Sequence, residues 1–146
     1  MSILEVDARH VERGRWIASI LLESHSPEAR VSSRDFLAMA RHRPGLVPMQ
    51  PRIESLSFDL GEAEREPVAR LRLRARDRLG LLAGVLQGIL SCDLRPRELW
   101  IRTREGWAED WIVLESLAGT APLPEALDAL RRRLGDPNAR PDQRRE

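Results

Sequence analysis

The stretch that decides the fold is residues 68–90, VARLRLRARDRLGLLAGVLQGIL. Its first part, Val68 to Arg76, alternates between apolar residues and arginines. A period of two is typical of a β-strand with one buried face. After a turn at residues 77–80, apolar residues recur at the spacing of an amphipathic helix. We therefore expect a strand, a tight turn and a helix at the centre of the fold.

Further strands are expected on both sides of this unit. Residues Ile53 to Leu60 alternate between apolar and polar side chains, which predicts a strand with one buried face. Residues Leu99 to Arg104 and Glu109 to Leu117 flank the turn Glu105-Gly106 and contain Trp and β-branched residues, which favours a hairpin. Prolines at 122 and 124 introduce a last helix, whose leucines at 123, 127, 130 and 134 share one side.

The order strand, strand, helix, strand, strand, helix predicts an α+β fold of the ferredoxin-like type. Such a fold is an antiparallel four-stranded sheet with two helices on one face. The usual last strand is missing, so the strand at 53–60 is expected to complete the sheet. Residues 136–146 contain two prolines and no large apolar residue, and we interpret them as a disordered tail.

A proline cluster, Pro44, Pro48 and Pro51, marks a border near residue 50. We expect residues 1–50 to form a partly helical N-terminal arm and residues 51–135 to form the main domain. In the arm, Asp7 is a candidate helix cap, although the run Trp16 to Leu22 is also compatible with a buried strand. A second short helix is expected after Ser32 and Ser33, with Phe36, Leu37 and Ala40 on one face.

Composition excludes several classes of protein. The 146 residues carry a net charge of +1, so the chain lacks the strongly cationic field of most nonspecific nucleic-acid binders. One cysteine, Cys92, cannot form an intramolecular disulfide. The N-terminus does not resemble a signal peptide, and we expect a cytoplasmic protein without a membrane span. The three histidines are too far apart for a metal site, and no cofactor is expected.

The segment Arg72 to Leu82, RLRARDRLGLL, resembles the first strand, turn and helix start of the ACT domain family. Within that family it is most similar to the C-terminal ACT repeat of the bacterial PII uridylyltransferases. Thr103 and Asp110 keep the spacing of seven residues that these repeats show in their hairpin. The resemblance covers about residues 51–134, and Leu79 stands where the family has a proline.

ACT domains are regulatory modules that bind amino acids. The resemblance therefore implies a non-catalytic sensing module that forms a homodimer or signals to a partner protein. Glutamine is the first ligand that it suggests, because the most similar repeats sense nitrogen status. Residues 1–50 do not resemble the catalytic domains of the uridylyltransferases, so we expect no enzymatic activity.

The candidate ligand site is the turn before the central helix. Gly80 allows a ligand to approach the backbone, and the N–H groups of Leu81 and Leu82 suit a carboxylate. Asp77 is placed to pair with the ammonium group of an amino acid. The predicted ligand-binding residues are Asp77, Arg78, Leu79, Gly80, Leu81 and Leu82. In the alternative interpretation, Gly80 only forms the turn and Asp77 caps the helix.

A second set of residues predicts an interface. Gly84 and Gly88 continue the four-residue spacing of Gly80, which indicates close approach by the sheet or by a second protomer. The predicted interface residues are Gly84, Gly88, Arg70, Arg72, Arg74, Trp100 and Trp111. Two alternative functions remain open: a ligand-free ACT-like scaffold for dimerisation or protein interaction, and RNA binding on the Arg and Trp face. The arginines are equally compatible with ion pairs to Asp59 or Glu115, cation–π contacts, or cover by the N-terminal arm.

Overall fold

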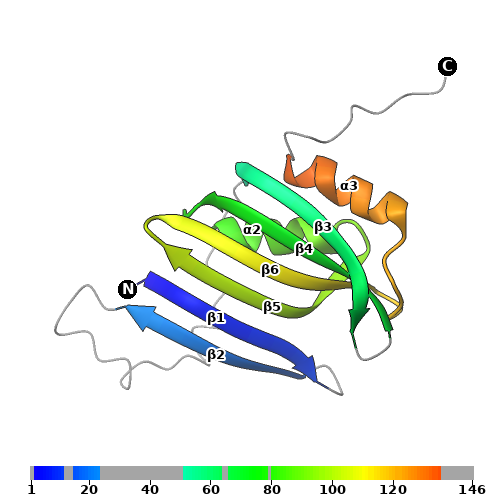
Figure 1. The fold of residues 1–146 in the computed structure, drawn as a ribbon, viewed down its shortest axis with the longest axis horizontal. Helices are drawn as coiled ribbons and strands as arrows, with labels where there is room; N and C mark the ends of the chain where they lie inside the picture. Colours follow the sequence, from blue (N-terminus) through cyan, green and yellow to red (C-terminus); the bar gives the residue numbers. More distant parts are fainter. Residues whose placement is uncertain (1, 12–14, 24–50, 64–65, 79, 136–146) are drawn as a thin grey trace.

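The computed structural model describes residues 2–11, 15–23, 51–63, 66–78 and 80–135. Their six strands form one antiparallel sheet in the order β2-β1-β5-β6-β4-β3 (Figure 1). The strands are β1 (Ser2–Val11), β2 (Arg15–Glu23), β3 (Ile53–Ala63), β4 (Glu66–Arg76), β5 (Leu94–Arg104) and β6 (Trp107–Ser116). The helices are α2 (Leu81–Leu90) and α3 (Pro124–Leu134). Neither helix has the length and apolar character needed to cross a membrane.

The expected four-stranded ferredoxin-like sheet with a helical N-terminal arm is wrong. The N-terminal residues form the hairpin β1–β2, which extends the sheet to six strands. Strand β1 pairs with β5, and Asp7 lies opposite Trp100. Val6 and Ala8 are buried and alternate with exposed Glu5 and Asp7, so Asp7 is a strand residue and not a helix cap. The helix expected after Ser32 and the tail at 136–146 lie outside the described residues, as does most of the proline cluster that marks the expected border near residue 50.

The segments from 53 to 134 follow the expected order of elements. Strand β3 pairs with β4, so that Leu56 lies opposite Leu73, and the strand expected at 53–60 is therefore part of the sheet, at one of its edges. Strands β5 and β6 form the expected hairpin. Its turn residues Glu105 and Gly106 both have positive φ angles, 52° and 76°, which match a tight hairpin turn.

The core lies between the sheet and the two helices, and α2 stands behind the sheet in Figure 1. Val85 and Ile89 of α2 and Leu130 and Leu134 of α3 are fully buried. They pack in one cluster with apolar residues from five strands. Burial of such a side chain contributes about 1.5–3 kcal/mol, so this cluster dominates the stability of the fold.

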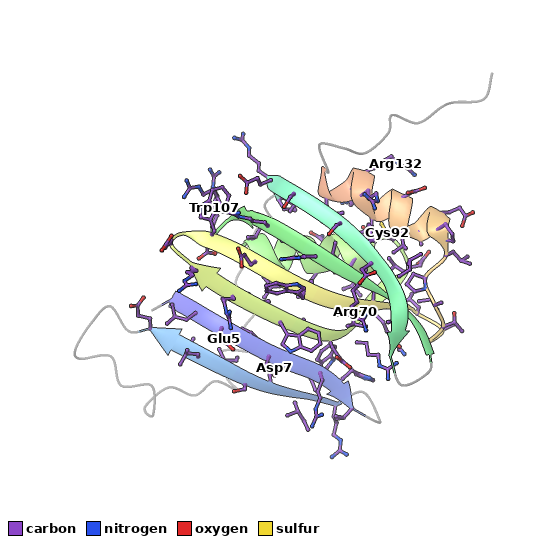
Figure 2. The ribbon with its side chains drawn as sticks, viewed as in Figure 1. Glu5, Asp7, Arg70, Cys92, Trp107 and Arg132 are labelled. Carbon is purple, nitrogen blue, oxygen red and sulfur yellow. The ribbon has the colours of Figure 1, made fainter. Side chains whose placement is uncertain are left out.

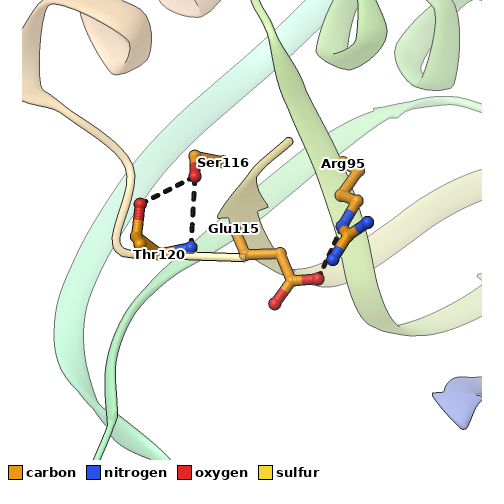
Figure 3. Close-up of polar contacts among 4 residues, drawn as sticks. All are labelled: Arg95, Glu115, Ser116 and Thr120. Atoms are coloured by element: carbon orange, nitrogen blue, oxygen red, sulfur yellow. Dashed lines mark hydrogen bonds and ion pairs between the residues drawn. The ribbon is translucent and has the colours of Figure 1, made fainter. Parts of the chain in front are cut away.

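The connection from β6 to α3 is held by polar contacts (Figure 3). Ser116 and Thr120 share a hydrogen bond of 2.8 Å between their hydroxyl groups, and the Thr120 N–H donates to Ser116 Oγ at 3.1 Å. Arg95 of β5 donates to Glu115 of β6 at 2.7 Å across the hairpin. These contacts fix the direction in which the chain leaves the sheet toward α3.

Candidate functional site

A cavity of about 750 Å³ opens where β4 ends and α2 begins. Its walls come from five segments: the start of β3, the end of β4, the first turn of α2, the start of β6 and the residue after α3. The lining residues are Pro51, Arg52, Ile53, Glu54, Arg76, Arg78, Leu81, Trp107 and Gly135. A cavity of this size is typical of small-molecule sites, and its position at the junction of several elements is typical as well.

Gly80 lies in the turn between two residues that line the cavity, Arg78 and Leu81. Gly80 precedes α2 with a left-handed φ of 87°, a conformation that glycine adopts without strain. The Leu81 N–H donates to Arg78 O at 3.0 Å, and the Gly84 N–H donates to Gly80 O at 2.9 Å. This turn brings the chain from the end of β4 into α2 within a few residues.

Arginines give the cavity a positive character. Arg52, Arg76 and Arg78 line it, against one carboxylate, Glu54. Glu54 forms an ion pair of 3.2 Å with Arg74, so part of its charge is already compensated. Guanidinium groups bind carboxylates with two parallel hydrogen bonds, and the cavity therefore suits a ligand that carries a carboxylate.

The structure places the predicted ligand-binding residues in different environments. Arg78 and Leu81 line the cavity, and Gly80 forms its turn. Asp77 is exposed, and its N–H donates to Gly106 O at 3.0 Å. Leu82 packs against the core. The expectation of a free N–H at Leu81 is wrong because Arg78 O accepts it, and Leu79 lies outside the described residues.

Seven of the nine lining residues were not among the predicted ligand-binding residues: Pro51, Arg52, Ile53, Glu54, Arg76, Trp107 and Gly135. Arg52 and Trp107 lie in segments far apart in the chain and come together through the pairing of β3 and β6 with β4, whereas Gly135 reaches the cavity from the end of α3. Trp107 lies under the guanidinium of Arg76, with 4.1 Å between the Arg76 Cζ and the ring centroid. No local pattern marks these residues as neighbours, because their contact depends on the strand order.

Asp110 is the one buried charged side chain that the described residues contain, with 1% of its surface exposed. It projects from β6 into the helix-covered face, between Leu73 of β4 and Ile101 of β5. Its Oδ1 has no hydrogen-bond partner. Burial and, to a smaller extent, the charge of Asp77 raise the pKa of Asp110 to about 7. In the sequence, Asp110 lies two residues from both Ala108 and Ile112. Because alternate residues of a strand share one face of the sheet, this spacing would have indicated its buried position.

The face of the sheet opposite the helices carries the arginines of β4 and three tryptophans. Trp111 of β6 lies opposite Arg72 of β4 on one side and Trp100 of β5 on the other. The Arg72 Cζ is 5.3 Å from the Trp111 ring centroid, and the Arg74 Cζ is 4.7 Å from that of Trp107. Within the described part of the chain, no helix covers this surface, which we call the open face and which is turned to the viewer in Figure 2.

The predicted interface residues fall into two groups. Gly84 and Gly88 are buried, and a Cβ on Gly88 would lie 2.9 Å from Leu134 Cδ2 of α3, so a contact within the chain explains this glycine. The other group lies together on the open face and consists of Arg70, Arg72, Arg74, Trp100 and Trp111. The described residues hold no cluster of three or more His, Cys, Asp or Glu side chains that suits a metal ion.

No protein-family model, no curated protein and no solved structure matches this chain.

Proposed function

We propose that this protein is a non-catalytic regulatory module that binds a small amino acid in the cavity at the start of α2. Occupancy of the cavity would be signalled to a second copy of the chain or to a partner protein. Glutamine is the first ligand to test, because the resemblance of residues 72–82 to ACT domains suggests nitrogen sensing. The proposal places the module in the cytoplasm, in keeping with its single cysteine.

The main support for the proposal is that the cavity lies at the turn predicted to bind the ligand. Arg78 and Leu81 were predicted from the turn, and both line the cavity. Arg52 and Arg76 add two further guanidinium groups from β3 and β4. A carboxylate bound between these arginines would be held by charge-assisted hydrogen bonds, while Ile53, Leu81 and Trp107 offer apolar contacts to the rest of the ligand.

The chemistry of the lining supports binding without catalysis. Guanidinium, aliphatic and indole groups make up most of the wall, and these groups do not transfer protons near neutral pH. The lining carboxylate, Glu54, is engaged with Arg74. We infer that a ligand leaves the cavity chemically unchanged.

The position of the cavity suits a regulatory role. A ligand there would contact β3, β4, α2 and the residue that ends α3, so binding would tie these elements together. A ligand shifts a conformational equilibrium by the difference between its affinities for the two states. Arrangements that keep these elements together would be favoured over arrangements in which they separate.

Thermal unfolding in the presence of each of the twenty amino acids tests the proposal, because a ligand bound only by the native state raises Tm. We expect a selective rise with one amino acid, glutamine before others. Arg78→Ala should abolish this rise, whereas Arg132→Ala on the exposed side of α3 should keep it. No rise with any amino acid, or an equal rise in the Arg78→Ala protein, would contradict the proposal.

A further inference from the structure

The open face has the size of a protein interface. Six strands spaced about 4.8 Å apart, each rising about 3.3 Å per residue over about nine residues, give a face of roughly 850 Å². Stable interfaces bury about 800 Å² on each partner and are enriched in Trp and Arg. The open face carries Trp100, Trp107 and Trp111, and Trp100 is 38% exposed although it lies near the middle of the sheet.

In two adjacent cross-strand rows the charges on this face are arranged antisymmetrically about its centre line, which runs between β5 and β6. In one cross-strand row, Arg72 of β4 and Asp7 of β1 lie on either side of the pair Trp111 and Trp100. In the next row, Arg74 and Glu5 take the outer positions, and Glu109 and Arg102 take the inner ones. In these two rows each positive position on one half therefore matches a negative position on the other half, whereas the row beyond Arg72 carries an arginine on both halves, Arg70 and Arg9.

This pattern selects one way of placing two copies face to face. Because the strand order is β2-β1-β5-β6-β4-β3, a two-fold axis parallel to the strands sets β4 of one copy over β1 of the other, and β6 over β5. Arg72 then faces the partner copy's aspartate at position 7, and Arg74 faces its glutamate at position 5. A two-fold axis across the strands would instead set β4 over β4 and oppose the arginines to one another.

We propose that a second copy of this chain binds the open face about a two-fold axis parallel to the strands, with β4 of each copy over β1 of the other. This proposal does not depend on ligand binding in the cavity. The central tryptophans of the two copies would stack at the axis, where hollows of about 330 and 350 Å³ on either side of Trp100 leave room for ring faces. Two sheets packed in this way lie about 10 Å apart.

The neighbouring rows differ in complementarity. Toward the hairpin turn, Trp107 of β6 would meet the partner copy's arginine at position 104, which adds a cation–π contact. In the row on the other side, Arg70 would meet the arginine at position 9 of the second copy, although each has a carboxylate opposite it in its own sheet, Asp59 and Glu98. Reversing the charge of Arg72 should therefore weaken the dimer, whereas reversing the charge of Arg70, two residues away on the same face, should not.

Charge-swap variants test this arrangement by sedimentation velocity and native mass spectrometry. The wild-type protein is expected to dimerise, and Arg72→Asp and Asp7→Arg should each raise the dimer Kd at least about tenfold, since like charges then face each other twice. An equal mixture of the two variants should form a heterodimer with both contacts restored. Within one chain, residues 72 and 7 are about 14 Å apart, three strand spacings, where exposed charges are largely screened.

Arg70→Asp serves as the matched control and should leave the dimer as tight as the wild type or tighter. A monomeric wild-type protein, or single variants that dimerise like the wild type, would overturn the proposal. So would a mixture that stays monomeric while both variants keep the near-ultraviolet circular dichroism of the native fold. Binding of a single-stranded oligouridylate by a wild-type monomer, weakened equally by Arg70→Asp and Arg72→Asp, would assign the open face to RNA instead.

Discussion

Leu73 of β4 and Asp110 of β6 are direct partners in the sheet, so a carboxyl group faces a fully buried leucine inside the apolar layer. Ile101 flanks the same carboxyl group from β5. A carboxylate in such surroundings loses hydration, and its Oδ1 has no hydrogen-bond partner, which favours the protonated form. The stability of the fold therefore depends on whether Asp110 is protonated. This dependence can be measured separately from ligand binding.

The stability of the protein should fall as the pH rises toward neutrality. The pKa of Asp110 is about 7 in the folded protein, against 3.8 as its ordinary value. The unfolded chain therefore releases this proton at lower pH than the folded chain does. This stabilising contribution is complete below about pH 4 and decreases by up to about 1.4 kcal/mol per pH unit until it is lost above pH ~7. Urea unfolding from pH 4 to 8 measures the slope.

The Asp110→Asn protein should lose this part of the pH dependence, because the amide does not titrate. Asp59→Asn, at an exposed position of β3, is the matched control and should keep the wild-type slope. If the Asp110→Asn and wild-type proteins show the same dependence of unfolding free energy on pH, the assignment of this proton to Asp110 is wrong.

Substitution of Gly80 should destabilise the protein through the backbone alone. Its φ is 87°, and a Cβ at this position would have no atom within 4 Å, so space is not the obstacle. A left-handed conformation costs an ordinary residue about 1–2 kcal/mol, and asparagine tolerates it better than alanine. Gly80→Ala should therefore lower the unfolding free energy by about that amount, and Gly80→Asn by less. Equal losses for the two variants, measured by urea unfolding, would contradict this explanation.

Gly88 allows α2 and α3 to approach each other, which predicts a coupling between Gly88 and Leu134. A Cβ on Gly88 would lie 2.9 Å from Leu134 Cδ2, and Leu134 is fully buried. Overpacking of this kind costs about 1–3 kcal/mol, so Gly88→Ala should destabilise the wild-type protein. In a Leu134→Val background the clashing methyl group is absent, and the same change should be neutral or stabilising by up to about 1 kcal/mol through helix propensity. Additive effects in this double-mutant cycle would exclude the contact.

Much of the central fold could be predicted because its pattern is local. The arginines and apolar residues of β4 alternate over nine residues from Val68 to Arg76, and the helical period begins soon after a glycine that can take a positive φ. The strand left open as an alternative at Trp16 to Leu22 is β2, although it is exposed and not buried, whereas β1 and its pairing with β2 were missed for a physical reason. In β1 the buried side is formed by the small Val6 and Ala8, and β2 exposes apolar residues such as Ile17 and Ile20 on both faces, so neither strand shows a strong period of two.

The candidate site was predicted in part for a similar reason. Arg78, Gly80 and Leu81 are neighbours in the chain, and a local motif is enough to bring them together. Arg52 and Trp107 reach the cavity through strand pairing over distances of more than twenty residues, which a single sequence does not encode locally. The charge pattern of the open face could not be predicted from the sequence, because Arg72 and Asp7 lie on strands that are not adjacent and the pattern depends on the strand order.

The most direct test of the central claim is a titration with glutamine, and with any amino acid that raises Tm, followed by the indole N–H signals of the four tryptophans in a ¹⁵N correlation spectrum. Trp100, Trp107 and Trp111 all lie on the open face, but of these only Trp107 lines the cavity, whereas Trp100 and Trp111 line the separate hollow in the middle of the face. Binding in the cavity predicts a saturable shift of the Trp107 signal that Arg78→Ala abolishes, with smaller changes at Trp100 and Trp111. A saturable shift confined to Trp100 and Trp111, or no shift of any indole signal, would contradict a ligand site at the start of α2.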